Sequence, residues 1–397
     1  LSWLLNTRGR DLKHTPISRS FCIVSKQKEI YVFTNNNNFQ KIFKKYKDIK
    51  FSNYEYLSTF LEKYKNKNFM IDSKVLPMGI FNYLEKNKLK FKYISCPVDQ
   101  FKTIKNSCEL KGFKNAHLKD GLAILKLLFW FEKKVYFKNL TEMKVSQKLL
   151  EIRSLEKTFV CESFSTISAF GSNGAIIHYK VDNSSNKTID RDGLYLIDTG
   201  AHYLDGTTDT TRTLLVGKAD TEMIDNYTLV LKGHISIASA VFPNVTKGRD
   251  IDALARLALW SKGKDYEHGT GHGVGSVLSV HEGPISISKT SECVIENGMV
   301  ISNEPGYYRN GKYGIRIENL EIVSKHNLKK SKNFFLHFEN LTRVPLELKL
   351  INKKMLTKFE IDWVNEYHQK VFKDLSKFIE TDHEELLIFL QRKTAPI

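Results

Sequence analysis

Residues 194–216 read LYLIDTGAHYLDGTTDTTRTLLV, in which two apolar runs flank a turn signal at Asp205–Gly206. This pattern predicts a β-hairpin. Asp198 and Asp209 are an odd number of residues apart, which puts both on one face of the sheet if the turn has an even length. A two-residue turn at Asp205–Gly206 would pair Asp209 with His202, so a shared metal site would need a bulge or a larger loop. Two solvated aspartates are the alternative, but Asp198 ends an apolar run and therefore needs a partner.

Residues 301–323 read ISNEPGYYRNGKYGIRIENLEIV and predict a second acidic hairpin, with its turn at Asn310–Gly311. Glu304 and Glu318 lie nearly symmetrically about this turn and an even number of residues apart. They reach a common face only with a three-residue loop or one bulged residue. Arg316, on the same predicted strand, is a candidate partner for a nearby carboxylate.

Residues 267–284 lie between the two hairpins and read EHGTGHGVGSVLSVHEGP. His268, His272 and His281 stand here among Gly269, Gly271, Gly273 and Gly275, which allow a backbone to approach a ligand or metal closely. Three histidines in so short a loop favour a functional over a structural role. The segment superficially resembles a dinucleotide-binding fingerprint, but no strand-to-helix context surrounds it.

Four carboxylates and a histidine form the ligand mix that suits Mn²⁺, Co²⁺ or Zn²⁺. With bridging carboxylates, two such ions would lie roughly 3.5–4 Å apart and share a hydroxide, the nucleophile of a hydrolase. The three segments together therefore predict a two-metal hydrolytic site.

The chain before these segments predicts an α/β unit in residues 1 to about 100, with no motif that indicates chemistry. Its predicted elements are two strands in 21–34, a helix in 51–66 and a short strand in 69–73.

From about residue 104 the pattern changes to long helices. Residues 122–135 belong to the first, and 141–154 predict a second with Thr141 at its N-cap. The stretch from about 158 to 325 is rich in strands and glycine, and the tail from about 355 is again helical. The sequence therefore predicts an α+β protein.

Composition and charge restrict the class of protein. The 397 residues are 41% hydrophobic and 26% charged, which is typical of a globular protein. A net charge of +17 would suit a nucleic-acid or membrane-surface binder. Lysines are spread along almost the whole chain without a basic helix, so we favour a Lys- and Asn-rich background and expect no nucleic-acid partner.

Cysteine usage and apolar runs predict a cytoplasmic protein. The five cysteines form no CxxC pair, which argues against a disulfide framework and a cysteine metal site. The longest apolar run, Leu122–Phe131, is broken by Lys126 and is too short to span a membrane. No signal peptide is evident. Because the chain begins with Leu1 and Trp3–Leu5 reads like the interior of a strand, we expect a fragment of a longer chain.

Four blocks resemble the signature motifs of the metallopeptidase family with the pita-bread fold, which includes methionine aminopeptidase, prolidase, creatinase and X-Pro aminopeptidase. The blocks are DTGAHYLDGTTDTTRT (198–213), HGTGHGVGSVLSVHEGP (268–284), EPGYY (304–308) and GIRIEN (314–319). The DGTTDxTRT hairpin and the long step from His272 to His281 are similar to the cytosolic, three-domain X-Pro aminopeptidase branch. Similarity also extends through residues 3–17, 163–179 and 363–368 to the C-terminal RKTAPI.

This resemblance implies an α+β chain in three parts. A partial creatinase-N-like α/β domain would occupy 1–103, the pita-bread catalytic domain 104–330, and a C-terminal extension of the catalytic domain 331–397. The first domain and the start of the second domain of the three-domain enzymes would be absent. Ser172, where the family usually has proline, and the KVDNSSN segment after Tyr179 depart from the family pattern and affect the positioning of substrate.

The resemblance also implies the metal ligands. They would be Asp198, Asp209, His272, Glu304 and Glu318, with Asp209 and Glu318 in the bridging positions.

Catalytic and supporting roles follow from the same resemblance. Glu304 would also shuttle a proton, and His281 would stabilise the reacting carbonyl. His178 would lie near the leaving proline, and Arg316 would orient a ligand carboxylate. His268 fits the motif as a supporting residue.

The implied activity is metal-dependent hydrolysis of an N-terminal Xaa-Pro bond by a hydroxide between two divalent ions. Mn²⁺ is the expected metal, with Co²⁺ and Zn²⁺ as alternatives. The expected partners are peptides that begin with Xaa-Pro and a second copy of the chain, with no nucleic acid and no membrane. One alternative is a prolidase, which cleaves only Xaa-Pro dipeptides; another is a non-catalytic relative that binds nucleic acid or protein.

Overall fold

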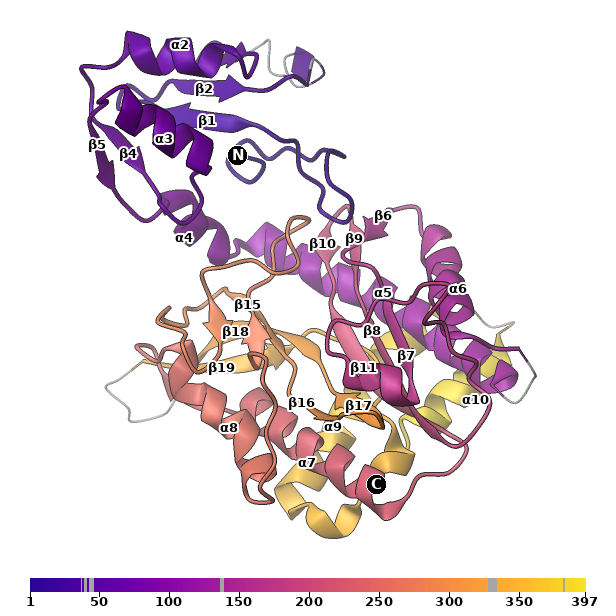
Figure 1. The fold of residues 1–397 in the computed structure, drawn as a ribbon. Helices are drawn as coiled ribbons and strands as arrows, with labels where there is room; N and C mark the ends of the chain where they lie inside the picture. The colour runs from indigo at the N-terminus through magenta and orange to yellow at the C-terminus, as the bar shows by residue number, and fades with distance from the viewer. Residues whose placement is uncertain (37, 39–40, 43–45, 136–138, 328–333, 381–382) are drawn as a thin grey trace. The chain divides into compact units, whose positions relative to one another are not determined.

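The structure is a computed structural model that describes residues 1–397 except 37, 39–40, 43–45, 136–138, 328–333 and 381–382. Contacts between residues divide the chain into two compact units, Leu1–Lys102 and Thr103–Ile397 (Figure 1). The boundary predicted between residues 330 and 331 lies outside the described residues.

The first unit combines short strands with short helices. Its elements are β1 (Phe21–Val24), β2 (Ile30–Phe33), β3 (Ile49–Ser52), α2 (Tyr56–Lys63), β4 (Phe69–Ile71), α3 (Met78–Lys86), β5 (Phe91–Tyr93) and α4 (Pro97–Thr103), which ends in the second unit. β1 and β2 are antiparallel, β3 adds to β2 in parallel, and β4 pairs with β5 in parallel. The predicted strands in 21–34 and 69–73 are confirmed.

The helix predicted in 51–66 begins later than expected. Phe51 and Ser52 belong to β3, where Phe51 pairs with Val32, and the helix starts at Tyr56. Backbone pairing with a neighbouring strand overrides the helical periodicity of the preceding residues. On α2 itself, Phe60 lies against Tyr31 of β2 with ring centroids 4.6 Å apart, as the apolar face predicts.

Several helices of the second unit begin at residues whose side chains cap them. Asn106 and Glu109 form a capping box at the start of α5, and the Thr141 side chain accepts from the Lys144 amide at the start of α6, as predicted. The helices are α5 (Ser107–Lys134), α6 (Glu142–Ser154), α7 (Thr221–Ala238), α8 (Gly248–Trp260), α9 (Lys358–Leu375) and α10 (Glu384–Lys393), with short 3₁₀ turns at η1 (Gly171–Ala175), η2 (Leu348–Leu350), η3 (Lys353–Met355) and η4 (Ser376–Phe378).

The strands of this unit form several small sheets between the helices (Figure 1). They are β6 (Phe159–Glu162), β7 (Ile167–Phe170), β8 (Gly193–Thr199), β9 (Ala201–Tyr203), β10 (Gly206–Thr207), β11 (Thr210–Val216), β12 (Val241–Pro243), β13 (Gly271–His272), β14 (Ser286–Ile287), β15 (Val300–Asn303), β16 (Gly306–Arg309), β17 (Tyr313–Arg316), β18 (Asn319–His326) and β19 (Phe335–Asn340). Their orders are β11-β8-β7, β10-β9-β6 and β12-β19-β18-β15, with β13-β14 and β16-β17 as pairs. Helices α5 and α6 contact β9, β10 and β7, whereas α7 contacts β15 and β19.

The turn of the first acidic hairpin is displaced by one residue from the predicted Asp205–Gly206. Tyr203 pairs with Gly206, so the two-residue turn is Leu204–Asp205. A Cβ on Gly206 would lie 2.9 Å from Ala116 Cβ of α5. Close packing against α5, rather than the turn itself, therefore requires this glycine.

This displacement brings the two aspartates together without a bulge between them. Thr211 faces Asp198 across β8 and β11, and the β9–β10 pair has the same register. Asp209 therefore lies opposite Gly200 rather than His202, about two residues or roughly 7 Å along the strand from Asp198. The predicted need for a bulge or a larger loop is wrong, because it assumed the other turn position.

The second acidic hairpin has a three-residue loop, one of the two arrangements that its spacing allows. Arg309 pairs with Tyr313, and Gly311 within the loop has φ +70°, a conformation that favours glycine. The same register continues into β15 and β18, so Glu304 and Glu318 lie opposite each other.

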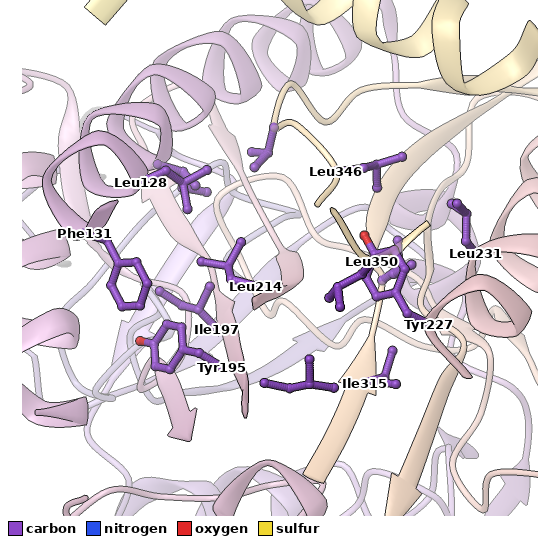
Figure 2. Packing of buried hydrophobic residues seen from close by; sticks show 14 of the residues in the cluster. Leu128, Phe131, Tyr195, Ile197, Leu214, Tyr227, Leu231, Ile315, Leu346 and Leu350 are labelled. Atoms are coloured by element: carbon purple, nitrogen blue, oxygen red, sulfur yellow. The ribbon is translucent and has the colours of Figure 1, made fainter. Parts of the chain in front are cut away.

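The main hydrophobic core packs behind these strands (Figure 2). Phe131 of α5 stacks on Tyr195 of β8 with ring centroids 5.0 Å apart, and Leu214 of β11 and Ile315 of β17 extend the same cluster. Core packing on one side of β8, β11 and β17 leaves their ends to carry the polar residues described next. Among the described residues, no helix has both the length and the apolarity needed to cross a membrane.

Candidate metal centre

Four carboxylates, three of them buried and Glu304 half-buried, converge from three segments in one cluster with two histidines. Ligand atoms lie within 4.8 Å of one another in each of three groups: Asp198, Asp209 and Glu318; His272, Glu304 and Glu318; and Asp209, His272 and His281. Asp209, Glu318 and His272 each belong to two groups, so the groups adjoin. The structure thus brings together all five residues predicted as metal ligands, with His281 beside them.

The His272 imidazole presents one nitrogen to this cluster. Its Nδ1 lies 2.9 Å from the Gly273 carbonyl oxygen, so Nδ1–H donates there and Nε2 is the nitrogen that faces the carboxylates. Nε2 lies 3.4 Å from Glu304 Oε1 and 3.5 Å from Asp209 Oδ2. This is the tautomer that a histidine needs to bind a metal through Nε2.

Burial, and then mutual repulsion, make Asp209, Glu304 and Glu318 hard to ionise together. Burial, and then the charges of Asp198 and Glu304, raise the pKa of Asp209 well above its usual value. Burial, followed by Asp209, Glu304 and Asp198, raises the pKa of Glu318 in the same way. The pKa of Glu304 is also raised, mainly by burial. Such a cluster needs compensating positive charge if all of its members are to be ionised at neutral pH.

Arg316 supplies part of that charge. Its Nη2 donates to Asp198 Oδ2 at 2.6 Å, as predicted, and its Nη1 donates to the Tyr308 hydroxyl at 2.6 Å. That hydroxyl lies 2.8 Å from His268 Nε2, while His268 Nδ1 faces the Gly269 carbonyl oxygen. Burial, and then Arg316, lower the pKa of His268 to about 4, so the ring is neutral and Tyr308 donates to it. His268 is thus placed at the end of a hydrogen-bonded chain that starts at Asp198.

A buried ion pair between Arg153 and Asp120 contacts the first acidic hairpin next to its two aspartates. Arg153 of α6 donates to both carboxylate oxygens of Asp120 of α5, at 2.8 and 3.0 Å. Arg153 also donates to Thr199 Oγ1 at 2.7 Å, and Thr208 Oγ1 donates to Asp120 at 2.7 Å. Because Thr199 and Thr208 adjoin the two aspartates, this pair fixes both strand ends.

His281 and His178 lie at the more open side of the cluster. The His281 ring is partly open to solvent and meets His272 edge-on with centroids 4.2 Å apart. Surrounding protein atoms, and then His272 and His178, lower the pKa of His281 to about 4, so its imidazole is neutral at physiological pH. His178 is exposed and close enough to interact electrostatically with His281 and His268.

Comparison with known proteins bears directly on this cluster. The sequence pattern of metallopeptidase family M24 matches residues 111–325, the C-terminal region of the same peptidases matches 334–397, and the creatinase/prolidase N-terminal domain matches 1–109. The chain belongs to metallopeptidase family M24.

Relatives within family M24 are similar over the whole chain. Xaa-Pro aminopeptidase 1 of Dictyostelium discoideum is 40% identical over 100% of this chain and 64% of its own length. A probable Xaa-Pro aminopeptidase P of Paracoccidioides brasiliensis (strain Pb03) is also 40% identical, over 100% of this chain and 68% of its own. The present chain thus spans about two thirds of the length of these relatives.

A solved structure supports the same assignment. X-prolyl aminopeptidase of Caenorhabditis elegans, described as a cytosolic enzyme with a di-nuclear active site, superposes with a TM-score of 0.90 at 35% identity, covering 100% of this chain and 66% of that one. The predicted α+β pita-bread fold with a creatinase-type N-terminal domain is confirmed.

Several residues of this M24 site were not predicted individually. Thr211 Oγ1 donates to Glu318 Oε2 at 2.7 Å, Ser302 Oγ donates to Glu304 Oε1 at 3.0 Å, and Tyr308 links Arg316 to His268. Ser302 stands two positions before Glu304, on the same face of the strand, which was an available signal. Tyr308 and Thr211 could be found only once the two hairpins were packed against each other.

Proposed function

We propose that this chain is a metal-dependent aminopeptidase that hydrolyses the first peptide bond of substrates with proline in second position. The observation that carries the proposal is the convergence of five side chains from β8, the start of β11, β13 and the second hairpin on adjoining ligand groups. Membership of family M24 and the similarity to Xaa-Pro aminopeptidases support the substrate class.

The residues present fit two divalent cations. Asp198 Oδ1 is buried and has no hydrogen-bond partner among the described residues, as expected of an oxygen that faces a cation. The donor set of carboxylate oxygens and one imidazole nitrogen suits Mn²⁺, which we propose as the metal, and also Co²⁺ or Zn²⁺. Asp198, Asp209, His272, Glu304 and Glu318 would hold the ions, with Asp209 and Glu318 shared between them. When bound, the ions would activate water and polarise the scissile carbonyl.

The chain's own residues would then move the proton and stabilise charge. Glu304, which accepts a hydrogen bond from Ser302, would take a proton from the attacking water and pass it to the proline nitrogen. This transfer matters because the proline nitrogen of an Xaa-Pro bond carries no hydrogen and must gain one to leave. Neutral His281 can donate a hydrogen bond to the oxyanion that develops on the carbonyl.

Further residues would set the geometry of the site and the substrate. Arg316 holds the Asp198 carboxylate through its 2.6 Å hydrogen bond, and His268 and Tyr308 hold Arg316. His178, on the open side, would contact the proline that leaves. The proline ring restricts the peptide on both sides of the bond, so a dedicated contact of this kind favours proline over other residues.

A peptide panel tests this proposal. The protein, stripped of metal and reloaded with Mn²⁺, should cleave Xaa-Pro-Xaa peptides and release the first residue, with little cleavage of matched Xaa-Ala-Xaa peptides. Product identity is read by mass spectrometry, and chelation should abolish the reaction. Cleavage confined to Xaa-Pro dipeptides would assign the chain to prolidases instead. If no peptide of the panel is cleaved, with or without metal, the proposal is refuted.

The organisation of the molecule is part of the same proposal. We propose an N-terminal creatinase-like part in 1–103, the catalytic domain in 104–330 and its extension in 331–397. We also propose a cytoplasmic homodimer. Sedimentation equilibrium would test the dimer, and a monomeric mass at micromolar concentration would refute it.

A further inference from the structure

A second buried ion pair lies close to the candidate metal centre and has no part in the function proposed above. Lys105, just before α5, donates from Nζ to Glu282 Oε1 at 2.7 Å. The two side chains are only 2% and 3% exposed. Removing two charges from water is costly, and apolar residues often stabilise such a position as well or better. The pair therefore calls for an explanation other than stability.

Backbone hydrogen bonds around Glu282 join the segment that carries His281 to the segment that carries His272. Glu282 directly follows His281, and its amide donates to the Gly273 carbonyl oxygen at 2.8 Å. Gly273 in turn directly follows His272, and its amide donates to the Ile285 carbonyl oxygen at 3.0 Å. The backbone around Glu282 thus determines how the His281 ring meets the His272 ring.

The loop between these histidines is held in a strained conformation over the Glu282 carboxylate. Val277, buried and β-branched, has φ +54°, which side chains of this type rarely adopt. Its amide donates to Thr207 Oγ1 at 3.0 Å. Glu282 Oε2 occupies the space beside Gly275, where an added Cβ would lie 2.6 Å from it. The carboxylate therefore packs under the loop, and its position and the loop's conformation depend on each other.

Lys105 is fixed to the strand that leads to Glu304. Its amide donates to the Gly298 carbonyl oxygen at 2.8 Å, and Ile104 bridges to Met299, directly before β15. β15 ends at Asn303, next to Glu304. The ion pair consequently connects the segment that carries His281 with the strand that positions Glu304, through side chains that are almost wholly buried.

We propose that Lys105 and Glu282 are positioning residues for hydrolysis: their ion pair holds His281 at a set place relative to His272 and Glu304. The inference rests on the proposed function for its catalytic consequence. Neither side chain touches the substrate, and both act through His281.

Isosteric variants test this role. Glu282→Gln and Lys105→Met each remove one charge with little change in volume. Each should lower kcat per folded molecule at least tenfold on an Xaa-Pro-Xaa peptide and leave KM within about twofold. If Glu282→Gln does not fold, Glu282→Asp, which keeps the charge but shortens its reach, should show the same split between kcat and KM.

A double-mutant cycle separates positioning from general support of the fold. In a His281→Ala background, Glu282→Gln should lower kcat no further than about twofold, because its effect passes through the missing ring. A full, additive loss in that background, or an unchanged kcat in the single variant, would overturn the inference. Glu360→Gln is the matched control: Glu360 accepts from Lys232 at 2.6 Å between α9 and α7, away from the histidines, and kcat should stay within twofold. A tenfold loss of kcat in Glu360→Gln as well would show that the effect of Glu282→Gln is general destabilisation, and would refute the positioning role.

A readout without catalysis keeps the inference separate from the proposed function. In the histidine-labelled protein at fixed pH, Glu282→Gln should shift or broaden the imidazole NMR signals of His281, identified by their loss in His281→Ala, and leave those of His383 unchanged. If the wild-type protein hydrolyses nothing, the proposed function fails, and this spectrum still decides the positioning. An unaltered His281 signal would overturn it.

Discussion

At the scale of single residues, Glu304 and its surroundings show what could be predicted and what could not. The motif EPGYY and the position of Glu304 opposite Glu318 predict an acidic group in a hairpin, and the structure places that half-buried group 3.4 Å from His272 Nε2. The Ser302 hydroxyl that orients the carboxylate depends on the strand face and becomes clear only in the fold. Residue identity predicts the ligand type, whereas packing determines the hydrogen bonds that orient it.

Replacement of Glu304 by Gln should therefore separate binding from turnover. The amide oxygen can still accept from Ser302, but the side chain can no longer carry a proton, so kcat should fall by roughly 10²–10⁴-fold. Steady-state kinetics on an Xaa-Pro-Xaa peptide and metal content by mass spectrometry measure the two effects. Glu267→Gln, an exposed neighbour of the histidine loop, is the control and should change kcat less than twofold. Substantial activity in Glu304→Gln would remove Glu304 from proton transfer.

Glu321 gives a pH prediction that is independent of catalysis. Burial raises its pKa from 4.5 to about 8, so the folded protein keeps a proton that the unfolded chain releases. The stabilisation from this proton is complete below pH 4.5 and is lost as pH rises through about 8. Buried histidines with lowered pKa values affect stability only below about pH 6.5. Between pH 7 and 8.5, with Mn²⁺ present, the free energy of unfolding should fall by about 1 kcal/mol.

Glu321→Gln should remove this decline, since the amide cannot titrate. Urea unfolding at several pH values measures it, and the free energy of unfolding of the variant should stay level over the same range. An equal decline in wild type and variant would show that Glu321 is ionised in the folded protein at pH 7.

At the scale of elements, the two acidic hairpins show how much of the turn position and strand register can be predicted from residue spacing. The even separation of Glu304 and Glu318 allows either a three-residue loop or one bulged residue, and the structure has the loop, of which the turn residues Asn310 and Gly311 are part. The first hairpin was predicted with its turn one residue too late, because Gly206 was interpreted as a turn residue. Gly206 is needed for contact with α5, and sequence spacing carries no information about such a partner.

The segment that carries His178 gives a prediction at this scale, which concerns the stability of the folded protein. Buried Glu142 of α6 accepts from the Phe170 amide at 2.6 Å, from Asn173 Nδ2 at 3.0 Å and from the Tyr179 hydroxyl at 3.0 Å. These donors hold η1 and the chain on either side of it. In Glu142→Gln, an amide NH₂ would replace one acceptor oxygen and face donors, which should destabilise the protein by about 1–3 kcal/mol.

Urea unfolding checks this value. Glu151→Gln, exposed on the same helix and paired only at the surface with Lys148, is the matched control and should change stability by less than about 0.5 kcal/mol. Equal effects of the two substitutions would show that the Glu142 hydrogen bonds contribute nothing specific.

At the scale of the whole molecule, we expect bound metal to stabilise one of the two compact units and not the other. Leu1–Lys102 has a small core around Leu61, Ile71, Leu84 and Leu89, whereas all residues of the candidate metal centre lie in Thr103–Ile397. The α+β class and the helices α5, α6 and α9 could be predicted from the sequence, whereas α7 and α8 lie in the stretch 158–325 that was predicted to be rich in strands and glycine. How separate sheets of the second unit meet at one cluster could not, because that depends on packing between segments far apart in the chain.

Metal should therefore stabilise one unit selectively. In calorimetry, Mn²⁺ at about 100 times its Kd should stabilise the second unit by about 2.7 kcal/mol for each ion bound and raise its unfolding temperature, with no shift for the first unit. Asp209→Asn, which removes a shared carboxylate, should abolish the shift. Equal shifts of both transitions, or a shift that survives in Asp209→Asn, would mean that Mn²⁺ binds elsewhere.

The most direct measurement is anomalous X-ray scattering at the manganese edge from crystals of this protein grown with Mn²⁺. Two peaks roughly 3.5–4 Å apart are predicted between Asp209 and Glu318, one also contacted by Asp198 and the other by His272 and Glu304. A single peak, or strong peaks away from these five side chains, would contradict a two-metal centre.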